Sequence, residues 1–378
     1  MLKYLKLVTA GLCVFIGSTV QAQKPVTIGV TISSTGPAAS LGIAQRNTVE
    51  LFPETLGGRP VNYVVLDDAT DPSQATRNAR RLVEVENVDA IIGSSTTPNN
   101  LAVAEVSNEA KVPHLGLAPY TAKDQTWTFS LPQTYALMYD AVFKKLQQDG
   151  VKTIAFFGFS DALGDASWRE VEQLAEQYEI DVVAHERYRR TDQSVTAQAL
   201  KVIQSKADAV VFAASGSAAA LPMRALRERG YKGPFFQNHG VANNDFLRVA
   251  DKMGEGMIAP TGLVLVAEQL PDNHPSKSVG VKYLSMYEDK YGAGSRNPFG
   301  AYAYDAYLLL DRAIASVDGS VEAGTPEFRT ALLKELEKTD QLALTHGTSS
   351  LSADNHLGLR EDAVVLITIK DGQWRLTK

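Results

Sequence analysis

The sequence predicts an α/β protein made of two doubly wound lobes, each with a parallel-type sheet, and a ligand cleft between them. First, strand-like and helix-like segments alternate from Pro25 onward, and the strands are continuous apolar runs, as is typical of parallel sheets covered on both faces. Second, the alternation restarts after Leu131 and Pro132 and gives a second unit of similar size. Third, a chain of 378 residues is too long for one small core and suits two domains.

The N-terminus has the pattern of a secretory signal peptide over residues 1–22. Lys3 and Lys6 precede an apolar run at 7–20, and Ala22 is the small residue expected at a cleavage site. The apolar run is too short to anchor the chain as a transmembrane helix. We therefore expect cleavage after Ala22 and export of the mature chain.

The single cysteine, Cys13, lies inside that segment and follows Leu12, whereas a lipoprotein signal needs a small residue in that place. The mature chain would then have no thiol, no disulfide and no thiolate metal site. The formal net charge of −6 becomes more negative when Lys3 and Lys6 are removed. Such an acidic exported protein is a poor candidate for nucleic-acid binding.

The first unit opens with a strand rich in Val, Ile and Thr, and a turn at 34–37 leads into a helix that reaches about residue 54. Asp71, Pro72 and Ser73 are start signals for the next helix. Short right-handed crossovers should join these elements. The predicted strands are 26–33, 61–67, 90–93 and 113–117, and the two further predicted helices are 73–86 and 99–110.

The second unit repeats this order. Its predicted helices are 134–148, 165–178, 194–206, 218–229 and 244–253, and its predicted strands are 153–157, 181–186, 209–213 and 234–237. The remaining segments are helices at 276–291, 300–316 and 326–337 and a terminal strand at 363–369.

Those last segments contain too few strands for a third domain, so they must complete the first two. We therefore expect three crossings between the lobes, near residues 131, 262 and 346. The predicted first lobe is 23–131 plus 263–345, and the predicted second lobe is 132–262 plus 346–378.

One turn of the first unit is dense in hydroxyl groups, because Ser94, Ser95, Thr96 and Thr97 separate a buried strand from a helix. Pro98 suits the first turn of that helix, where its missing N–H costs nothing. The helix start therefore directs free backbone N–H groups and a partial positive charge toward whatever lies above the turn. A carboxylate could be held there by N–H groups and hydroxyls, without a cationic side chain. The alternative is that Thr96 or Thr97 only caps the helix.

Doubly wound lobes bind ligands at the carboxyl ends of their strands, where loops commonly have functional roles. The turns that follow predicted strands are therefore candidate ligand-binding segments, although any one of them could instead be a plain surface turn. These turns are 33–36, 93–97, 118–121, 159–164, 215–218 and 239–243.

The sequence contains no pattern that indicates a metal site, a cofactor or an enzyme. The six histidines are scattered, and none has the paired spacing of a zinc site. Neither a nucleophile elbow nor a phosphate-binding loop is present. The glycines at 292–294 follow a helix and fit a C-cap, and Asp67, Asp68 and Asp71 fit turn and cap positions.

The chain resembles the periplasmic solute-binding proteins of ABC importers, of the leucine/isoleucine/valine-binding type. The resemblance covers nearly the whole mature chain in order. It is carried by VTIGVTISSTGPAASLG, IIGSSTTPNNLAVAEVSNEAKVPHLG, FQNHGVANNDFL, NPFGAYAYDAYLLLDRAI, DNHLG and AVVLITIKDGQW. It implies two Rossmann-like lobes, three hinge crossings, location in the periplasm, closure around a small ligand, and delivery to an inner-membrane permease and ATPase.

The resemblance also implies which residues contact the ligand. The family holds the ligand carboxylate at the turn that contains Ser95, Thr96 and Thr97 and at the loop from Ala118 to Thr121. Leu41 and Phe299 fall where the family packs the apolar part of the ligand.

Three departures from the family affect the expected ligand. Amino-acid binders hold the ligand ammonium with an acidic residue directly before GVAN, and this chain has His239 there. A tyrosine of the family is replaced by Leu163, and the loop that ends at Ser217 has no aromatic residue. A buried ammonium without a countercharge is costly.

We therefore expect a small carboxylate ligand without an α-ammonium group. An aromatic acid of benzoate type, or a branched aliphatic or keto acid, would fit. His239 would then hydrogen-bond a ring substituent or a second carboxylate, unless it merely packs in its turn.

Three alternatives remain open from the sequence. The protein could bind true branched-chain amino acids, or it could be a sensor that presents its lobes to a receptor. It could also be a secreted hydrolase or amidase, for which Ser160, Ser217 and His239 are the candidate catalytic residues. We expect a monomer, because no long exposed apolar stripe suggests a dimer.

Overall fold

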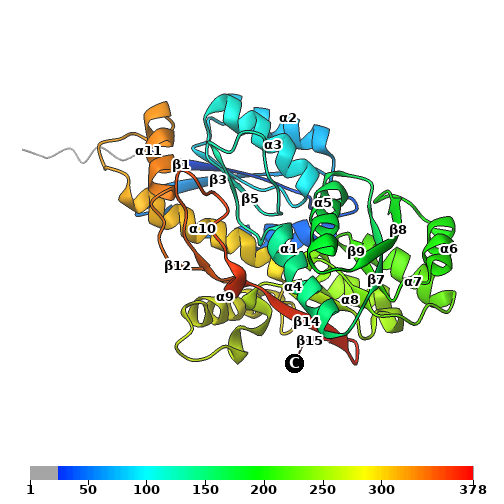
Figure 1. The fold of residues 1–378 in the computed structure, drawn as a ribbon. Coiled ribbons are helices and arrows are strands. Elements are labelled where there is room, and N and C mark those ends of the chain that lie inside the picture. Colours follow the sequence, from blue (N-terminus) through cyan, green and yellow to red (C-terminus); the bar gives the residue numbers. More distant parts are fainter. Residues whose placement is uncertain (1–23, 378) are drawn as a thin grey trace, which may run out of the picture.

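The computed structural model describes residues 24–377 and has two α/β lobes, each built on its own sheet (Figure 1). The predicted signal peptide, residues 1–22, lies outside the described residues. Within 24–377, no helix is both long enough and apolar enough to cross a membrane.

The first sheet has six strands in the order β2-β3-β1-β4-β5-β6. All neighbours are parallel except β2 and β3, which form an antiparallel hairpin. The strands are β1 (Val26–Ile32), β2 (Thr55–Leu56), β3 (Arg59–Asp67), β4 (Ala90–Ile92), β5 (His114–Gly116) and β6 (Thr128–Ser130).

Helices cover both faces of this sheet, as continuous apolar strands require. Figure 1 shows α2 and α3 above the strands and α1 and α10 below them. Apolar side chains of α2 and α3 share one buried cluster with Ile91, and those of α1, α10 and α11 share another with Ile28 and Ile92. The helices are α1 (Ala39–Val49), α2 (Pro72–Glu84), α3 (Thr97–Ala110), α9 (Pro275–Tyr291), α10 (Pro298–Ser316) and α11 (Pro326–Leu336).

The second sheet has seven strands in the order β15-β14-β11-β10-β9-β7-β8. The strands from β8 to β11 are parallel, and β14 and β15 extend the sheet as an antiparallel edge. The strands are β7 (Thr153–Phe159), β8 (Asp181–Tyr188), β9 (Ala209–Ala213), β10 (Phe235–Phe236), β11 (Ile258–Thr261), β14 (Val365–Lys370) and β15 (Gln373–Leu376).

The helices of the second lobe pack with this sheet in one large apolar cluster. They are α4 (Tyr135–Gln148), α5 (Ala162–Gln177), α6 (Thr196–Ser205), α7 (Ala220–Glu228) and α8 (Asn244–Ala250). The remaining elements are the strands β12 (Leu342–Ala343) and β13 (Thr348–Ser349) and the short 3-10 helices η1 (Ser217–Ala219), η2 (His239–Val241), η3 (Asp251–Gly254), η4 (Leu263–Gln269) and η5 (Glu361–Ala363).

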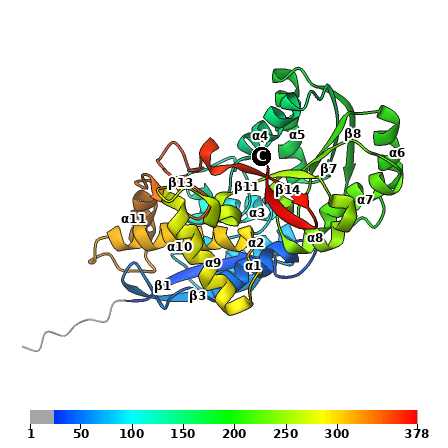
Figure 2. The ribbon, with the colours of Figure 1, turned by 90° about the horizontal axis from the view of Figure 1, so that it is seen from below.

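The chain passes between the two sheets three times, as expected. It leaves the first sheet after β6, returns after β11 to the helices that pack on the first sheet, and comes back as β14 (Figure 2). The three passages meet at one point, because a Cβ atom added to Gly262 would lie 2.0 Å from His346 Nδ1 and 2.8 Å from Gln133 Nε2. The residues that divide the lobes, 131, 262 and 346, remain predictions.

Several short strands lie outside the predicted set. The strands β2, β6, β11 and β15 have two to four residues each, and the predicted helix 244–253 ends at Ala250 and continues as η3.

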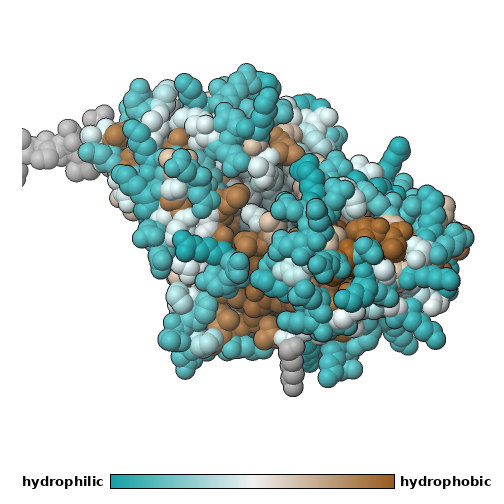
Figure 3. All heavy atoms as spheres, viewed as in Figure 1, coloured by the Kyte–Doolittle hydropathy of each residue, from teal (hydrophilic) through white to brown (hydrophobic). Residues whose placement is uncertain are grey.

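Hydrophilic residues predominate on the face seen in Figure 3, where hydrophobic residues gather near the junction of the lobes and on the second lobe.

Candidate functional site

The turn between β4 and α3 is held by side chains of its own lobe. Asn100 accepts the Ser94 N–H at 2.6 Å and donates to the Ser94 carbonyl at 2.9 Å. Ser94 Oγ donates to the carboxylate of Asp68, which also accepts from Ser33 Oγ and from Asn99 Nδ2. Burial raises the pKa of Asp68, and these hydrogen bonds offset the effect in part. Ser94 is therefore a structural residue.

The other three hydroxyls of the turn have different roles. Ser95 Oγ accepts the Ser33 N–H at 2.9 Å and donates to Gln45 Oε1 at 2.5 Å. Thr97 Oγ1 donates to the Pro119 carbonyl at 2.7 Å and lies 2.8 Å from Tyr135 Oη, across the junction of the lobes.

Thr96 occupies the N-cap position of α3, but its side chain makes no capping hydrogen bond. The hydroxyl is buried and has no partner among residues 24–377. The alternative, that the Thr96 or Thr97 side chain only caps the helix, is therefore wrong for both side chains. Thr96 Oγ1 is therefore free to bind a ligand. Such a contact would remove the cost of burying a hydroxyl without a hydrogen-bond partner.

A small cavity of about 10 Å³ lies between the two lobes above this turn, and we call it the inner cavity. Its volume is close to what one water molecule requires. The first lobe contributes Leu41, Ser95, Thr96, Thr97, Ala118 and Pro119, and the second contributes Tyr135, Leu163, Ser215, Asn238, His239 and Gly240.

His239 lines the inner cavity from η2 and is only 7% exposed. Burial lowers its pKa to about 4, so the imidazole is neutral at neutral pH. Its Nδ1 lies 3.5 Å from Tyr302 Oη, and its ring meets the Phe299 ring edge-on at 6.0 Å. A neutral imidazole can exchange hydrogen bonds but provides no countercharge for an ammonium group.

Asn238, the neighbour of His239, adds a second free donor. Its Oδ1 accepts the Gly240 N–H at 2.8 Å and fixes the amide. Its Nδ2 is buried and has no hydrogen-bond partner within 3.5 Å in residues 24–377, and the Asn238 side chain acts on the Tyr139 hydroxyl at longer range. None of the described residues that line the inner cavity is acidic.

The structure gathers most of the predicted site residues around this cavity. Leu41, Ser95, Thr96, Thr97, Ala118, Leu163 and His239 all line it. Three others lie elsewhere. Thr121 lines a neighbouring cavity of about 390 Å³, Ser217 lines a surface pocket of the second lobe, and Phe299 is buried behind His239.

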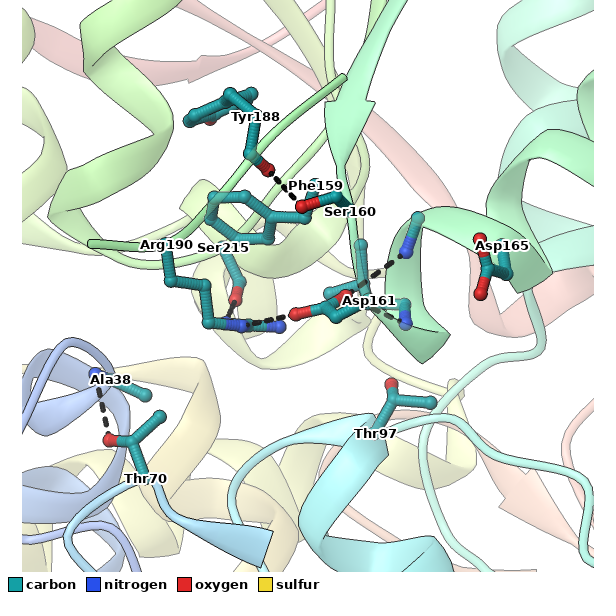
Figure 4. Close-up of polar contacts among 12 residues, drawn as sticks. Ala38, Thr70, Thr97, Phe159, Ser160, Asp161, Asp165, Tyr188, Arg190 and Ser215 are labelled. Atoms are coloured by element: carbon teal, nitrogen blue, oxygen red, sulfur yellow. Dashed lines mark hydrogen bonds and ion pairs between the residues drawn. The ribbon is translucent and has the colours of Figure 1, made fainter. Parts of the chain in front are cut away.

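Tyr135, Asn238 and Arg190 were not predicted, whereas Asp161, the partner of Arg190, lies in the predicted candidate turn 159–164 (Figure 4 shows the pair). Arg190 Nε donates to Asp161 Oδ2 at 2.5 Å, and Nη1 donates to Ser215 Oγ at 2.9 Å. The signal for Arg190 was available, because it lies two residues beyond the end of β8. The turn after the predicted strand 181–186 was not among the candidate turns.

The candidate catalytic residues do not form a pair. Ser160 Oγ donates to the Tyr188 carbonyl at 3.1 Å, and Ser217 lies on the second-lobe surface. Within residues 24–377, neither serine hydrogen-bonds His239. Across 24–377, no group of three or more His, Cys, Asp or Glu side chains could hold a metal ion.

The sequence profile of the periplasmic binding protein family matches residues 25–373. A Pseudomonas aeruginosa protein named leucine-, isoleucine-, valine-, threonine-, and alanine-binding protein is 22% identical to this chain over 332 residues, which are 82% of this chain and 83% of that protein.

Solved structures show the same fold. An extracellular ligand-binding receptor from Rhodopseudomonas palustris HaA2 is 39% identical, with a TM-score of 0.92 over 94% of this chain and 100% of that one. The branched-chain amino acid transporter substrate binding protein from Streptococcus pneumoniae, solved with isoleucine, is 18% identical, with a TM-score of 0.77 over 93% and 98% of the two chains.

Proposed function

Because the chain belongs to the periplasmic binding protein family, we propose that it is the substrate-binding component of an ABC uptake transporter. It would be exported through the predicted signal peptide and would work in the periplasm as a monomer. Its partners would be an inner-membrane permease and an ATPase. The family and the names of the relatives support this role.

We further propose that its ligand is a small carboxylate without an α-ammonium group, favouring an aromatic acid. The observation that carries this proposal is the inner cavity, whose free polar atoms suit an acceptor. Thr96 Oγ1 and Asn238 Nδ2 are buried without partners in the described structure, and His239 is neutral at neutral pH. An ammonium group would be buried there with no charge directly opposite it, at a cost of several kcal/mol on the order expected for buried ions.

The proposed carboxylate contacts come from the first lobe. Ser95, Thr96, Thr97 and the loop at Ala118 would hold the carboxylate at the start of α3. There the first backbone N–H groups of the helix have no intrahelical acceptor. Leu41 and Leu163 would pack the apolar part, because both line the inner cavity.

A thermal-shift screen tests this proposal with the refolded mature protein. One set of ligands is benzoate, 4-hydroxybenzoate, phenylacetate and 4-methyl-2-oxopentanoate, and the other is leucine, isoleucine and valine. A ligand at a hundredfold its dissociation constant adds about 2.7 kcal/mol to the free energy of unfolding. We expect a rise in melting temperature with acids of the first set alone, and a rise only with the amino acids would contradict the proposal.

The second candidate function is binding of branched-chain amino acids, which the names of the relatives favour. It would require an acidic partner for the ammonium group from outside the cavity lining. A sensor role uses the same lobes, and binding to a purified receptor domain instead of a permease would distinguish it.

A further inference from the structure

Arg190 is a largely buried cation that hydrogen-bonds a residue of the inner cavity and that the proposed carboxylate contacts do not use. It lies just past the end of β8, and its side chain is 12% exposed. The guanidinium stacks over the Phe159 ring at 4.3 Å from the centroid. Figure 4 shows Arg190, Asp161 and Ser215 on the second lobe, opposite Thr97 and Thr70 of the first lobe.

Two of the three guanidinium nitrogens of Arg190 are occupied. Nε donates to Asp161 at 2.5 Å, and Nη1 donates to Ser215 Oγ at 2.9 Å. Because Ser215 lines the inner cavity, the guanidinium is one hydrogen bond away from a residue of the cavity wall. The third nitrogen, Nη2, is buried and has no hydrogen-bond partner in residues 24–377.

Asp161 is fully engaged. Its Oδ1 accepts the N–H groups of Leu163 and Gly164 at 3.0 and 3.3 Å and thereby caps α5. Its Oδ2 accepts from Arg190. The pair thus positions a guanidinium rigidly, with one charged donor left over, and guanidinium is the side chain that matches a carboxylate best.

We propose that Arg190 contacts the ligand carboxylate from the second lobe, so that the acid is held from both sides when the lobes close. This inference rests on the proposed function, which names an acid as the ligand. The contact would satisfy the buried Nη2 donors, which are otherwise costly. It would also couple binding to closure, because Thr96 and Arg190 belong to different lobes.

Amino-acid binding would give the same pair the opposite role. Asp161 is linked to the cavity wall through Arg190 and Ser215, so it would be the member of the pair that holds the ammonium group. The two possibilities therefore differ in which member of the pair contacts the ligand.

The test is isothermal titration of benzoate, 4-methyl-2-oxopentanoate and leucine into the mature wild type and four single or double variants. These are R190Q, R190K, D161N and D161N/R190Q. Asparagine at 161 keeps an oxygen for the α5 cap and removes the charge.

The matched control is R187Q. Arg187 lies in β8, three residues before Arg190. Its side chain donates to the Phe159 carbonyl at 2.6 Å and pairs with Asp165 at 2.7 Å. It therefore supports the same loop as Arg190 without a contact to the cavity wall in the described structure. Thermal melts of all variants, compared with R187Q, separate loss of binding from loss of folding.

We expect R190Q to weaken acid binding about 10- to 100-fold, with a smaller loss in R190K, which keeps the charge but not the planar fork. D161N should bind the acids at least as tightly as the wild type. The double variant should remain as weak as R190Q.

Four results would overturn the inference. Acid binding in R190Q as tight as in R187Q would remove Arg190 from the site and leave the proposed function intact. Wild-type affinity in the double variant would mean that Arg190 only neutralises Asp161. Leucine binding that is lost in D161N, or wild-type binding of none of the three compounds, would contradict both the inference and the proposed ligand class.

Discussion

Thr96 differs from its neighbours because folding uses their hydroxyls and leaves its own free. Ser94 Oγ donates a hydrogen bond to Asp68, and Ser95 Oγ donates one to Gln45. Thr97 Oγ1 donates a hydrogen bond to the Pro119 carbonyl. These bonds fix the turn at the start of α3. The remaining hydroxyl is therefore pre-positioned, and little conformational freedom is lost when a ligand binds it.

Thr96→Val should weaken binding of the preferred acid by about 1 to 2 kcal/mol, because it removes one hydrogen bond and keeps the side-chain shape. Titration calorimetry measures the change. The control is Ser107→Ala, which removes another buried hydroxyl without a described partner from the same helix, far from the turn. Equal affinities of the two variants would exclude Thr96 from the site.

Asp305 is a buried acid near the third crossing. It accepts the Thr345 N–H at 2.7 Å, and burial raises its pKa to about 7. The unfolded chain releases this proton near pH 4, whereas the folded chain keeps it until about pH 7. This group therefore lowers the free energy of unfolding as pH rises between those values.

Asp305→Asn removes this loss. The stability of the variant relative to the wild type should rise by about 2 to 4 kcal/mol between pH 4 and pH 7.5. Urea denaturation at several pH values measures it. Parallel stability curves for the two proteins would show that Asp305 ionises normally.

At the scale of elements, the loop between β9 and η1 closes against the first lobe. Gly216 has φ of +66°, and a Cβ atom there would lie 3.2 Å from Ser40 Oγ and 3.3 Å from the Pro37 carbonyl. Both neighbours precede or begin α1 of the opposite lobe. This glycine therefore permits the close approach of the lobes.

Gly216→Ala should weaken acid binding by about 1 kcal/mol or more, because it strains the backbone and obstructs closure. Gly230→Ala is the matched control, since Gly230 has φ of +84° and nothing within 4 Å of an added Cβ. Both variants should lose stability, and only the first should lose affinity. A similar affinity loss in both would contradict the role of Gly216 in closure.

Long periodic segments and their order could be predicted from the sequence, whereas short strands could not. The structure confirms the α/β class and the two lobes, because continuous apolar runs and helix start signals such as Asp71 are local features. β11 contains Pro260, which ordinarily argues against a strand. The antiparallel partner of β11 is β14, which lies more than a hundred residues later in the sequence.

The candidate site likewise has a part that local sequence predicts and a part that depends on the fold. The turn at Ser95 to Thr97 was predictable from one stretch of sequence. Asn238 and Tyr135 come from other elements, and only the fold brings them to the same cavity. Which hydroxyl remains free depends on Asp68, Gln45 and Tyr135, so spacing alone could not identify Thr96.

At the scale of the whole molecule, the two lobes meet around one small cavity and three crossings. Gln133 and His346 lie in two of the crossings, and Tyr302 stacks on His346 at 3.7 Å while its hydroxyl donates to Gln133 at 2.5 Å. Tyr302 also approaches His239 of the inner cavity. The cleft and the hinge are therefore in direct contact.

The inner cavity of about 10 Å³ has room for about one water molecule and not for an acid of five or more heavy atoms. Entry therefore requires the lobes to separate further than in this structure. Closure would then exclude water and strengthen the hydrogen bonds to a carboxylate.

Paired titrations test the proposed ligand class most directly. Leucine and 4-methyl-2-oxopentanoate differ only at the α position, and so do phenylglycine and benzoylformate. We predict that in at least one pair the oxo acid binds more than about tenfold tighter than the amino acid, a difference of about 1.4 kcal/mol. Tighter binding of the amino acid in both pairs would show that the cleft supplies a partner for the ammonium group, and would contradict the proposed ligand class.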